Sequence, residues 1–254
     1  MTDEEWIPLR RPRLPDAEAL LPYLRRIDAA GKYSNFGPLC REFETRLSAH
    51  FGVESAGVVT VCNATAGLAL ALRSIDSPGG RYCVMPAFTF PATPAAAVEA
   101  GFEPLFADID PESLALTPAH VETLLADGYD IGAVQPVSAF GYPVAVADWE
   151  AFEARTGIPV VVDGAWCFDS LRPSSLIQVV SLHATKVLGI GEGGAIVSTD
   201  TERMARLRRQ SNFGLGAGRR IDRPAGNSKL SEYAAAVGQA ALDQWPTRRA
   251  ALAN

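Results

Sequence analysis

Short apolar runs alternate with alanine-rich stretches through most of this 254-residue chain, and this alternation limits the possible folds more than any other feature. The apolar runs predict buried strands at 57–61, 81–85, 103–107, 131–137 and 158–162. Between and after these runs, helical stretches are predicted at 65–73, 92–100, 118–126 and 147–156. The pattern indicates an α/β fold in which helices flank a mixed, mostly parallel sheet.

Both ends of the chain extend this pattern. Apolar runs at 177–182 and 195–197 follow one another without an intervening helix, so we expect an antiparallel strand in the later part of the sheet. Further helices are predicted from Pro38 to a stop at Gly52, at 201–211 and at 230–243. Residues 1–37 are proline-rich and are expected to form an N-terminal arm on a single domain of residues 1–254.

Charge and composition exclude several classes of protein. A formal net charge of −6 argues against nucleic-acid binding. The four cysteines lack paired spacing, which is typical of reduced thiols in a cytoplasmic protein. Three histidines without HxH or HxxxH grouping argue against a metal site. With no apolar run of membrane-spanning length, we expect a soluble chain without a signal peptide or membrane anchor.

The segment S-L-H-A-T-K, residues 181–186, ends on a lysine just before the glycine-rich G-I-G-E-G-G of residues 189–194. A lysine enclosed by small and apolar neighbours can lose hydration, and its neutral amine can then form a Schiff base with pyridoxal phosphate. Most lysines are solvated surface charges, so the interpretation of Lys186 as a Schiff-base lysine depends on the residues around it. The glycines match G-x-G-x-x-G, but a strand-like A-I-V follows where a dinucleotide site needs a helix, so we expect them to let the backbone pass close to a cofactor.

Asp163 ends the buried strand I-P-V-V-V-D, where an unpaired carboxylate would be costly. A protonated pyridine nitrogen is a suitable partner, and a helix cap or a metal ligand are the alternatives. Lys186 comes 23 residues later, enough chain for a loop and a strand to return it to the same sheet edge. Ser181 is placed to offer a hydroxyl to a phosphate.

Two other strand ends are followed by candidate ligand-binding residues. In C-N-A-T-A-G-L, residues 62–68, Thr65 can cap the next helix while its hydroxyl and the amides of Thr65 and Ala66 face a phosphate. An ordinary helix cap is the alternative. Phe88 and Phe90 lie on the loop into the next predicted helix, and Phe90 is our choice for a ring that stacks on a flat heterocycle, with core packing as the alternative.

Together these motifs resemble the DegT-type nucleotide-sugar aminotransferases (DegT/DnrJ/StrS), which use pyridoxal phosphate and have the aspartate-aminotransferase fold. The matching segments are Y-S-N-F-G-P at 33–38, N-A-T-A-G-L at 63–68, P-A-F-T-F-P-A-T at 86–93, F-x-D-I-D at 106–110, V-V-D-G-A at 161–165, S-L-H-A-T-K with G-E-G-G at 181–194 and G-N-S-K-L-S-E at 226–232. They occur in one order along nearly the whole chain.

The resemblance implies that the chain moves an amino group from glutamate to a keto group of a nucleotide-linked sugar, for amino-sugar, surface-polysaccharide or secondary-metabolite biosynthesis. It also implies a homodimer with shared active sites. The implied roles are Lys186 as Schiff-base lysine and proton shuttle, Asp163 at the pyridine nitrogen, Phe90 as the stacking ring, Thr65, Ala66 and Ser181 at the phosphate, and Asn227 at the phosphate of the partner subunit. A lysine rather than the histidine of related dehydratases favours transamination.

Two departures from the family accompany this resemblance. Trp166 stands where the family often has glutamine or histidine near the cofactor's ring hydroxyl, and it offers only an indole N–H. Family members also continue for roughly another hundred residues as a smaller domain, so we expect a three-layer large domain with that small domain largely absent. The alternatives are a shortened, non-catalytic homologue that acts as a binding or regulatory subunit, and a different pyridoxal-phosphate reaction such as elimination or aldol-type cleavage.

Overall fold

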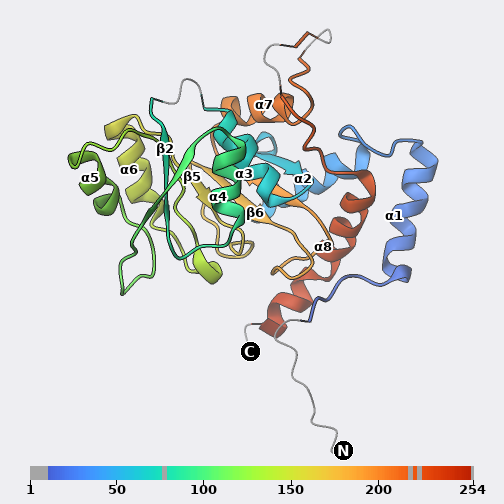
Figure 1. Cartoon of the computed structure of the whole chain (residues 1–254). Helices are drawn as coiled ribbons and strands as arrows, with labels where there is room; N and C mark the ends of the chain where they lie inside the picture. The colour runs from blue at the N-terminus through green and yellow to red at the C-terminus, as the bar shows by residue number, and fades with distance from the viewer. Residues whose placement is uncertain (1–10, 76–78, 217–219, 222–224, 253–254) are drawn as a thin grey trace, which may run out of the picture.

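The computed structural model describes residues 11–75, 79–216, 220–221 and 225–252, and within them the chain forms a sheet between two layers of helices (Figure 1). The strands are β1 (Val58–Val61), β2 (Tyr82–Pro86), β3 (Glu103–Ala107), β4 (Ile131–Val134), β5 (Val161–Asp163), β6 (Ile177–Ser181) and β7 (Gly194–Val197). They correspond to the strands predicted from the apolar runs, with shifts of a few residues at the ends.

The strand order follows from two hydrogen-bonded groups, β1-β7-β6-β5 and β3-β2-β4. Parallel bridges from Val134 to Val160 and from Val137 to Asp163 place β4 beside β5, so the sheet runs β3-β2-β4-β5-β6-β7-β1. Strand β7 is antiparallel to both β1 and β6, which confirms the expected antiparallel strand. The other strands are parallel, and their carboxyl ends meet at one edge of the sheet, here called the carboxyl edge.

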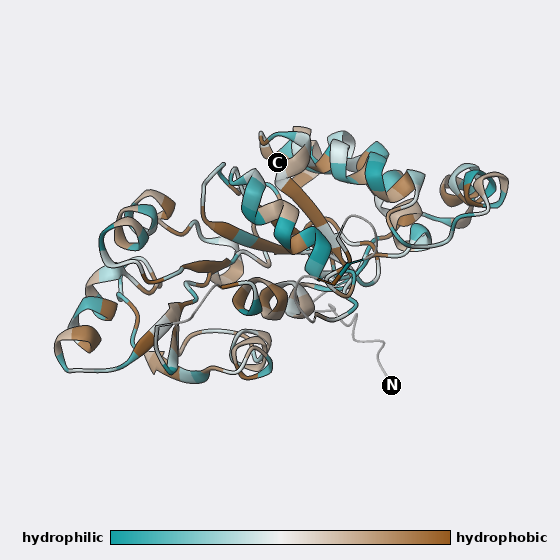
Figure 2. Cartoon of the chain, turned by 90° about the horizontal axis from the view of Figure 1, so that it is seen from above, coloured by the Kyte–Doolittle hydropathy of each residue, from teal (hydrophilic) through white to brown (hydrophobic). Residues whose placement is uncertain are grey.

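Helices cover both faces of this sheet. The helices are α1 (Ala17–Ala30), α2 (Pro38–Phe51), α3 (Ala64–Arg73), α4 (Ala92–Glu99), α5 (Pro118–Ala126), α6 (Val146–Thr156), α7 (Thr201–Gln210) and α8 (Glu232–Leu252), with short 3-10 turns at Ser55–Gly57 and Ala139–Gly141. One core lies under α3, α4 and α7, and on the other face two cores lie under α5 and α6 and under α2 and α8. Figure 2 shows hydrophobic strands between the helical layers. The fold is therefore the expected three-layer α/β arrangement.

Helix α1 lies inside residues 1–37, the segment expected to form an N-terminal arm, and no helix was predicted there. Asp16 caps the helix by accepting a hydrogen bond from the backbone N–H of Ala19, and Gly31 ends it in a left-handed conformation. The apolar face of α1 packs beside α8, where Ile27 is buried (Figure 1). The first ten residues of the expected arm lie outside the described residues.

Helix α8 also differs from its prediction, because it continues through Pro246 to Leu252 instead of ending near 243. Its first residue, Glu232, is only 1% exposed and accepts hydrogen bonds from the backbone N–H groups of Leu39 (2.9 Å) and Cys40 (2.8 Å). The carboxylate thus caps α2, whose own cap residue, Gly37, has no side chain. Among the described helices, none is long and apolar enough to span a membrane.

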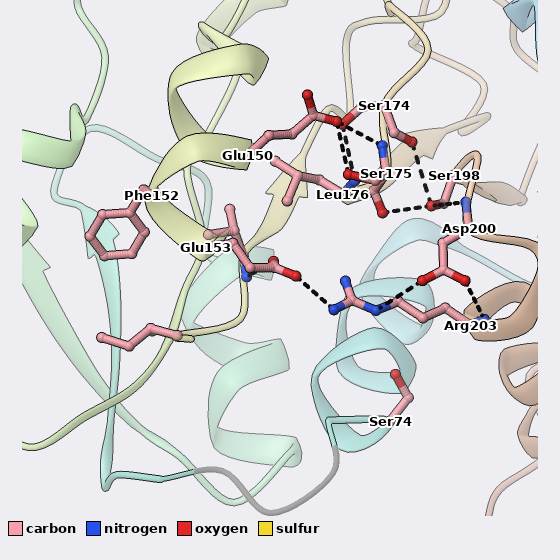
Figure 3. Close-up of polar contacts among 12 residues, drawn as sticks. Ser74, Glu150, Phe152, Glu153, Ser174, Ser175, Leu176, Ser198, Asp200 and Arg203 are labelled. Carbon is pink, nitrogen blue, oxygen red and sulfur yellow. Dashed lines mark hydrogen bonds and ion pairs between the residues drawn. The ribbon is translucent and has the colours of Figure 1, made fainter. Parts of the chain in front are cut away.

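A polar network ties α6 and α7 to the edge of the sheet opposite the carboxyl edge (Figure 3). One oxygen of Glu150 accepts hydrogen bonds from the Ser174 hydroxyl (2.7 Å) and from the backbone N–H of Ser175 (2.8 Å). These bonds, the one from Ser174 foremost, lower the pKa of Glu150. Arg203 of α7 pairs with Glu153 of α6 at 2.6 Å. The network stabilises the scaffold at a distance from the carboxyl edge.

Candidate active site

Asp163, the last residue of β5, forms the floor of a site at the carboxyl edge of the sheet. Its side chain is 4% exposed, accepts a hydrogen bond of 2.7 Å from the Thr93 hydroxyl and one of 3.2 Å from the Ala165 backbone N–H. Burial raises the pKa of Asp163, while these hydrogen bonds and the charge of Lys186 act in the opposite direction. A charged carboxylate at this position is therefore favoured by a cation placed against it.

Lys186 lies in the connection between β6 and β7, and its amine lies 4.0 Å from the ring centre of Trp166. The connection folds back on itself, with a hydrogen bond of 2.8 Å from the Ala184 N–H to the Gly191 carbonyl. A Cβ at Gly189 would lie 2.6 Å from the Ala184 carbonyl oxygen, so this tight fold requires glycine there. Because a strand follows these glycines, they do not form a dinucleotide site.

The entry of α4 places Phe90 and Thr93 on one turn, with the Thr93 N–H bonded to the Phe90 carbonyl (3.1 Å). Phe90 is 73% exposed, so it is not packed in the core of the described chain and its ring is open for stacking. Thr93 has no exposed surface, and its hydroxyl lies 2.6 Å from that of Thr89 as well as against Asp163. Sequence reasoning missed Thr93, although it ends the quoted motif of residues 86–93.

The structure corrects the expected phosphate cup after β1. Helix α3 begins at Ala64, and its cap is Asn63, whose side-chain oxygen accepts a hydrogen bond of 2.8 Å from the Ala66 N–H. Thr65 is therefore not the cap, and the Ala66 amide is engaged within the helix start. Thr65 stands in the first turn, where backbone N–H groups have no carbonyl partner within the helix. An anion site here thus rests on the Thr65 hydroxyl and the positive end of α3.

Ser181 ends β6 close to that helix start. It pairs in register with Gly194 of β7, which on its other side pairs with Val61 of β1. A Cβ at Gly194 would lie 2.9 Å from the backbone nitrogen of Ala64, so only glycine lets β7 approach the first turn of α3 this closely. Ser181 and Thr65 therefore flank one small region of the carboxyl edge, as the phosphate prediction requires.

Asn227 lies away from Asp163 but beside the start of α3. The Ser228 carbonyl accepts a hydrogen bond of 2.7 Å from the Cys62 N–H, and Lys229 pairs with Val61 on the side of β1 away from β7. Four strand spacings, or about 19 Å, therefore separate this segment from β5. Asn227 is exposed, and its side-chain oxygen accepts a hydrogen bond of 2.6 Å from the Lys229 amine. Its role at a partner's phosphate stays a prediction.

No group of three or more His, Cys, Asp or Glu side chains within the described ranges is arranged to hold a metal ion. The four cysteines are free thiols, of which Cys62 alone is only partly buried. Burial raises the pKa of the Cys40 thiol to about 12. These thiols are therefore structural groups and take no part in the chemistry considered below.

The fold and the sequence together identify a class of protein, the aminotransferases of the three-layer α/β type. Residues 16–254 match the DegT/DnrJ/EryC1/StrS aminotransferase family, and the chain belongs to that family. It is 31% identical over 253 residues to the dTDP-4-amino-4,6-dideoxy-D-glucose transaminase of Shigella dysenteriae, covering 96% of this chain and 66% of the relative.

Two further proteins are similar to this chain, one in sequence and one in structure. A protein of Mycobacterium tuberculosis (strain H37Rv) is 33% identical over 243 residues, which is 91% of this chain and 59% of that protein. The crystal structure of DesI in the presence of its TDP-sugar product superposes with a TM-score of 0.81 at 35% identity, over 94% of this chain and 60% of DesI. The chain thus spans about three fifths of the length of these two proteins.

Proposed function

We propose that this chain carries the cofactor site of an aminotransferase that uses pyridoxal phosphate, takes an amino group from glutamate and transfers it to a keto group of a nucleotide-linked sugar. The observation that carries the proposal is the buried carboxylate of Asp163 within electrostatic reach of the Lys186 amine at the carboxyl edge. Buried carboxylates away from a functional site are normally paired within the fold. Family membership supports the reaction class.

The residues present fit pyridoxal phosphate. The cofactor has a ring nitrogen that can carry a proton, a flat face and a phosphate, and this edge offers a partner for each. Asp163 is a buried anion that suits the protonated nitrogen, and Phe90 has an exposed ring for the flat face. Thr65 and Ser181, at the positive end of α3 and the end of β6, suit the phosphate. When bound, the cofactor supplies an electron sink for the bond next to the amino group.

Each side chain then has one task. Asp163 would hold the proton at the ring nitrogen, and the hydrogen bonds from Thr93 and Ala165 fix the orientation of its carboxylate. Lys186 accepts a proton at its amine nitrogen and returns it on the other side of the amino transfer. Phe90 covers one ring face and excludes water there. Holding the phosphate keeps the reacting bond aligned with the lysine.

The sugar substrate is proposed from the relatives. The Shigella transaminase is named for a dTDP-linked 4-amino sugar, and DesI was solved with a TDP-sugar product. A dTDP-linked 4-keto sugar is therefore the first substrate to test, with glutamate as donor. We place the enzyme in the cytoplasm, in amino-sugar biosynthesis for a surface polysaccharide or a secondary metabolite.

A homodimer with shared sites is part of the proposal. Asn227 is exposed beside the end of β1, where a second copy can reach it, and the family resemblance implies that it serves the phosphate of the partner subunit. Its side-chain oxygen faces the Lys229 ammonium, which can only donate. The amide NH₂ is thereby directed away from Lys229 and can donate to a phosphate of the partner subunit.

The test has two stages. The purified chain is incubated with pyridoxal phosphate, reduced with borohydride and digested, and mass spectrometry is expected to find the cofactor on Lys186. Glutamate labelled with ¹⁵N in its amino group and a dTDP-linked 4-keto sugar are then expected to yield a ¹⁵N-labelled amino sugar. Lys186→Ala should lower the rate by at least roughly several hundredfold, and equal rates for the variant and the wild type would contradict the proposal.

The same experiment separates the alternatives. Cofactor on Lys186 without any release of labelled nitrogen would favour a non-catalytic subunit that retains the cofactor site. Conversion of the sugar without consumption of glutamate would favour elimination or another pyridoxal-phosphate reaction. Sedimentation with and without cofactor measures the dimer, and Asn227→Ala should weaken cofactor binding in the dimer without lowering the stability of the isolated chain.

A further inference from the structure

The Lys186 amine lies over the face of Trp166, 4.0 Å from the ring centre. An ammonium within about 6 Å of an aromatic ring centre is attracted by the negative ring face, and tryptophan gives the strongest attraction of this kind. Both side chains are half-buried, so the amine is only partly surrounded by water. This contact therefore stabilises the charged amine more than it would on an exposed surface.

Trp166 is held in place from both sides of its backbone. The next residue, Cys167, is bonded through its N–H to the Gly164 carbonyl (2.8 Å), and its thiol donates to the Ser138 hydroxyl at 2.8 Å. On the other side the chain at Gly141 packs closely, since a Cβ there would lie 3.3 Å from the Trp166 carbonyl oxygen. Because its backbone is fixed at the end of β5, the indole offers Lys186 a defined surface.

We propose that Trp166 is a positioning residue whose indole face holds the protonated Lys186 amine whenever that amine is not joined to the cofactor. The proposed function requires Lys186 to leave the cofactor and to come back. The role given to Trp166 rests on that function, whereas the contact between the two side chains is independent of it. A held ammonium stays inside the site, within electrostatic reach of Asp163, and does not turn out into solvent. Trp166 thus keeps the released Lys186 amine near the position from which it rejoins the cofactor, and it favours the charged form of that amine.

Other charged groups act on the same amine. Asp163, at the end of β5, interacts electrostatically with Lys186, and the connection that carries Lys186 also holds His183 and Glu192, whose side chains lie 3.7 Å apart. Each carboxylate favours the ammonium whether or not Trp166 is present. The contribution of the indole must therefore be measured as a difference between variants at position 166 with these groups unchanged.

The lysine content makes this measurement direct, because the chain has three lysines, Lys32, Lys186 and Lys229. Reductive methylation with ¹³C-formaldehyde labels their amines in the cofactor-free full chain, and NMR follows each methyl signal with pH. Lys229 lies 4.8 Å from the ring centre of Phe213 and is a control with an aromatic contact of its own. Lys32 is exposed and gives the unshifted reference. Lys186→Arg assigns the third signal.

We expect the Lys186 methyl signal to be displaced upfield by the indole ring current in the wild type. In Trp166→Leu this displacement should disappear, and the titration midpoint of Lys186 should move about 1 pH unit lower, as a cation–π contact of ordinary strength requires. Trp166→Phe should lie between the two. The signals of Lys32 and Lys229 should be the same in all three chains.

Equal Lys186 chemical shifts and titration midpoints in the three chains would overturn the proposal. Trp166 would then only line the site. Circular dichroism checks that each variant is folded. If Trp166→Leu does not fold, Trp166→Phe is compared with the wild type instead. Equal Lys186 shifts and midpoints in these two chains would then overturn the proposal. If the wild-type chain shows the displaced Lys186 signal but transfers no amino group, the proposed function is contradicted and the contact with Trp166 is not.

Discussion

The hydroxyl of Thr93 donates a hydrogen bond of 2.7 Å to the carboxylate of Asp163, and the two residues are 70 positions apart in the chain. The bond joins the first turn of α4 to the end of β5 beneath the carboxyl edge. Thr93 is fully buried, so no water competes for the carboxylate oxygen that it satisfies. The orientation of the proposed cofactor partner therefore depends on a residue of a different element.

Replacing Thr93 with valine removes the hydroxyl at nearly constant volume. The variant leaves one oxygen of a buried carboxylate without its donor, which should lower the free energy of unfolding by about 1–3 kcal/mol and weaken cofactor binding roughly tenfold. Urea unfolding and a cofactor titration measure the two effects. Thr123→Val is the matched control, because that hydroxyl bonds only to a backbone carbonyl of its own exposed helix. Similar losses in both variants would argue against a specific role for Thr93.

Asp163→Asn should reveal the cost of the buried charge in the cofactor-free chain. Burial raises the folded-state pKa of Asp163 above its unfolded value, so the folded chain binds the proton at higher pH. The wild type then loses stability as pH rises from the unfolded-state pKa of Asp163 through its folded-state pKa, and the variant does not. The advantage of the variant in unfolding free energy should grow as pH rises above the unfolded value of 3.8, while its cofactor binding is lost. Asp28→Asn, on an exposed position of α1, should show no such trend.

Phe90→Ala separates a stacking role from packing. Because Phe90 is 73% exposed, the substitution should change the free energy of unfolding by less than about 0.5 kcal/mol. Loss of the stacked ring should lower cofactor affinity by roughly tenfold. Phe106→Ala, at a comparably exposed phenylalanine of β3, should leave affinity unchanged. An unaltered affinity in Phe90→Ala would show that this ring does not cover the cofactor.

Glu150→Gln tests the network on the opposite edge. Hydrogen bonds depress the folded-state pKa of Glu150, so its contribution to stability is present above the unfolded value of 4.5 and is lost as pH falls through the folded value. At neutral pH we expect the variant to unfold about 1 kcal/mol more easily, with no change in cofactor affinity. Below pH 4.5 the two chains should converge. Glu18→Gln is the comparison, because Glu18 is an exposed first-turn acid of α1 whose charge contributes only a helix-dipole interaction.

The sequence predicted the alternation of strands and helices well, and it failed at two prolines. Helix α1 contains Pro22 and helix α8 contains Pro246, and each was missed or shortened because proline lacks the N–H of a helix interior. In the structure α1 is held by its caps and by packing beside α8. Contacts between distant segments outweigh a local preference of this kind, and no local pattern reports them.

For the site residues as well, local features were visible in the sequence and contacts between distant residues were not. Asp163 and Ser181 were singled out because each ends a buried apolar strand, and Lys186 because it comes just before a glycine-rich segment, features that are visible in the sequence. The cap of α3 was misplaced from Asn63 to Thr65, since both residues can cap and only backbone geometry separates them. Thr93 was overlooked because its partner is 70 positions away.

The sequence by itself determined the class of fold and the side chains that meet at the carboxyl edge, because apolar periodicity and strand-end position are local properties. The tertiary structure alone decided which of them touch. It placed the Thr93 hydroxyl on Asp163, the Lys186 amine on the face of Trp166, and Asn227 beyond β1, four strand spacings from β5. These are contacts of packed elements, and their geometry is set when the helices close on the sheet.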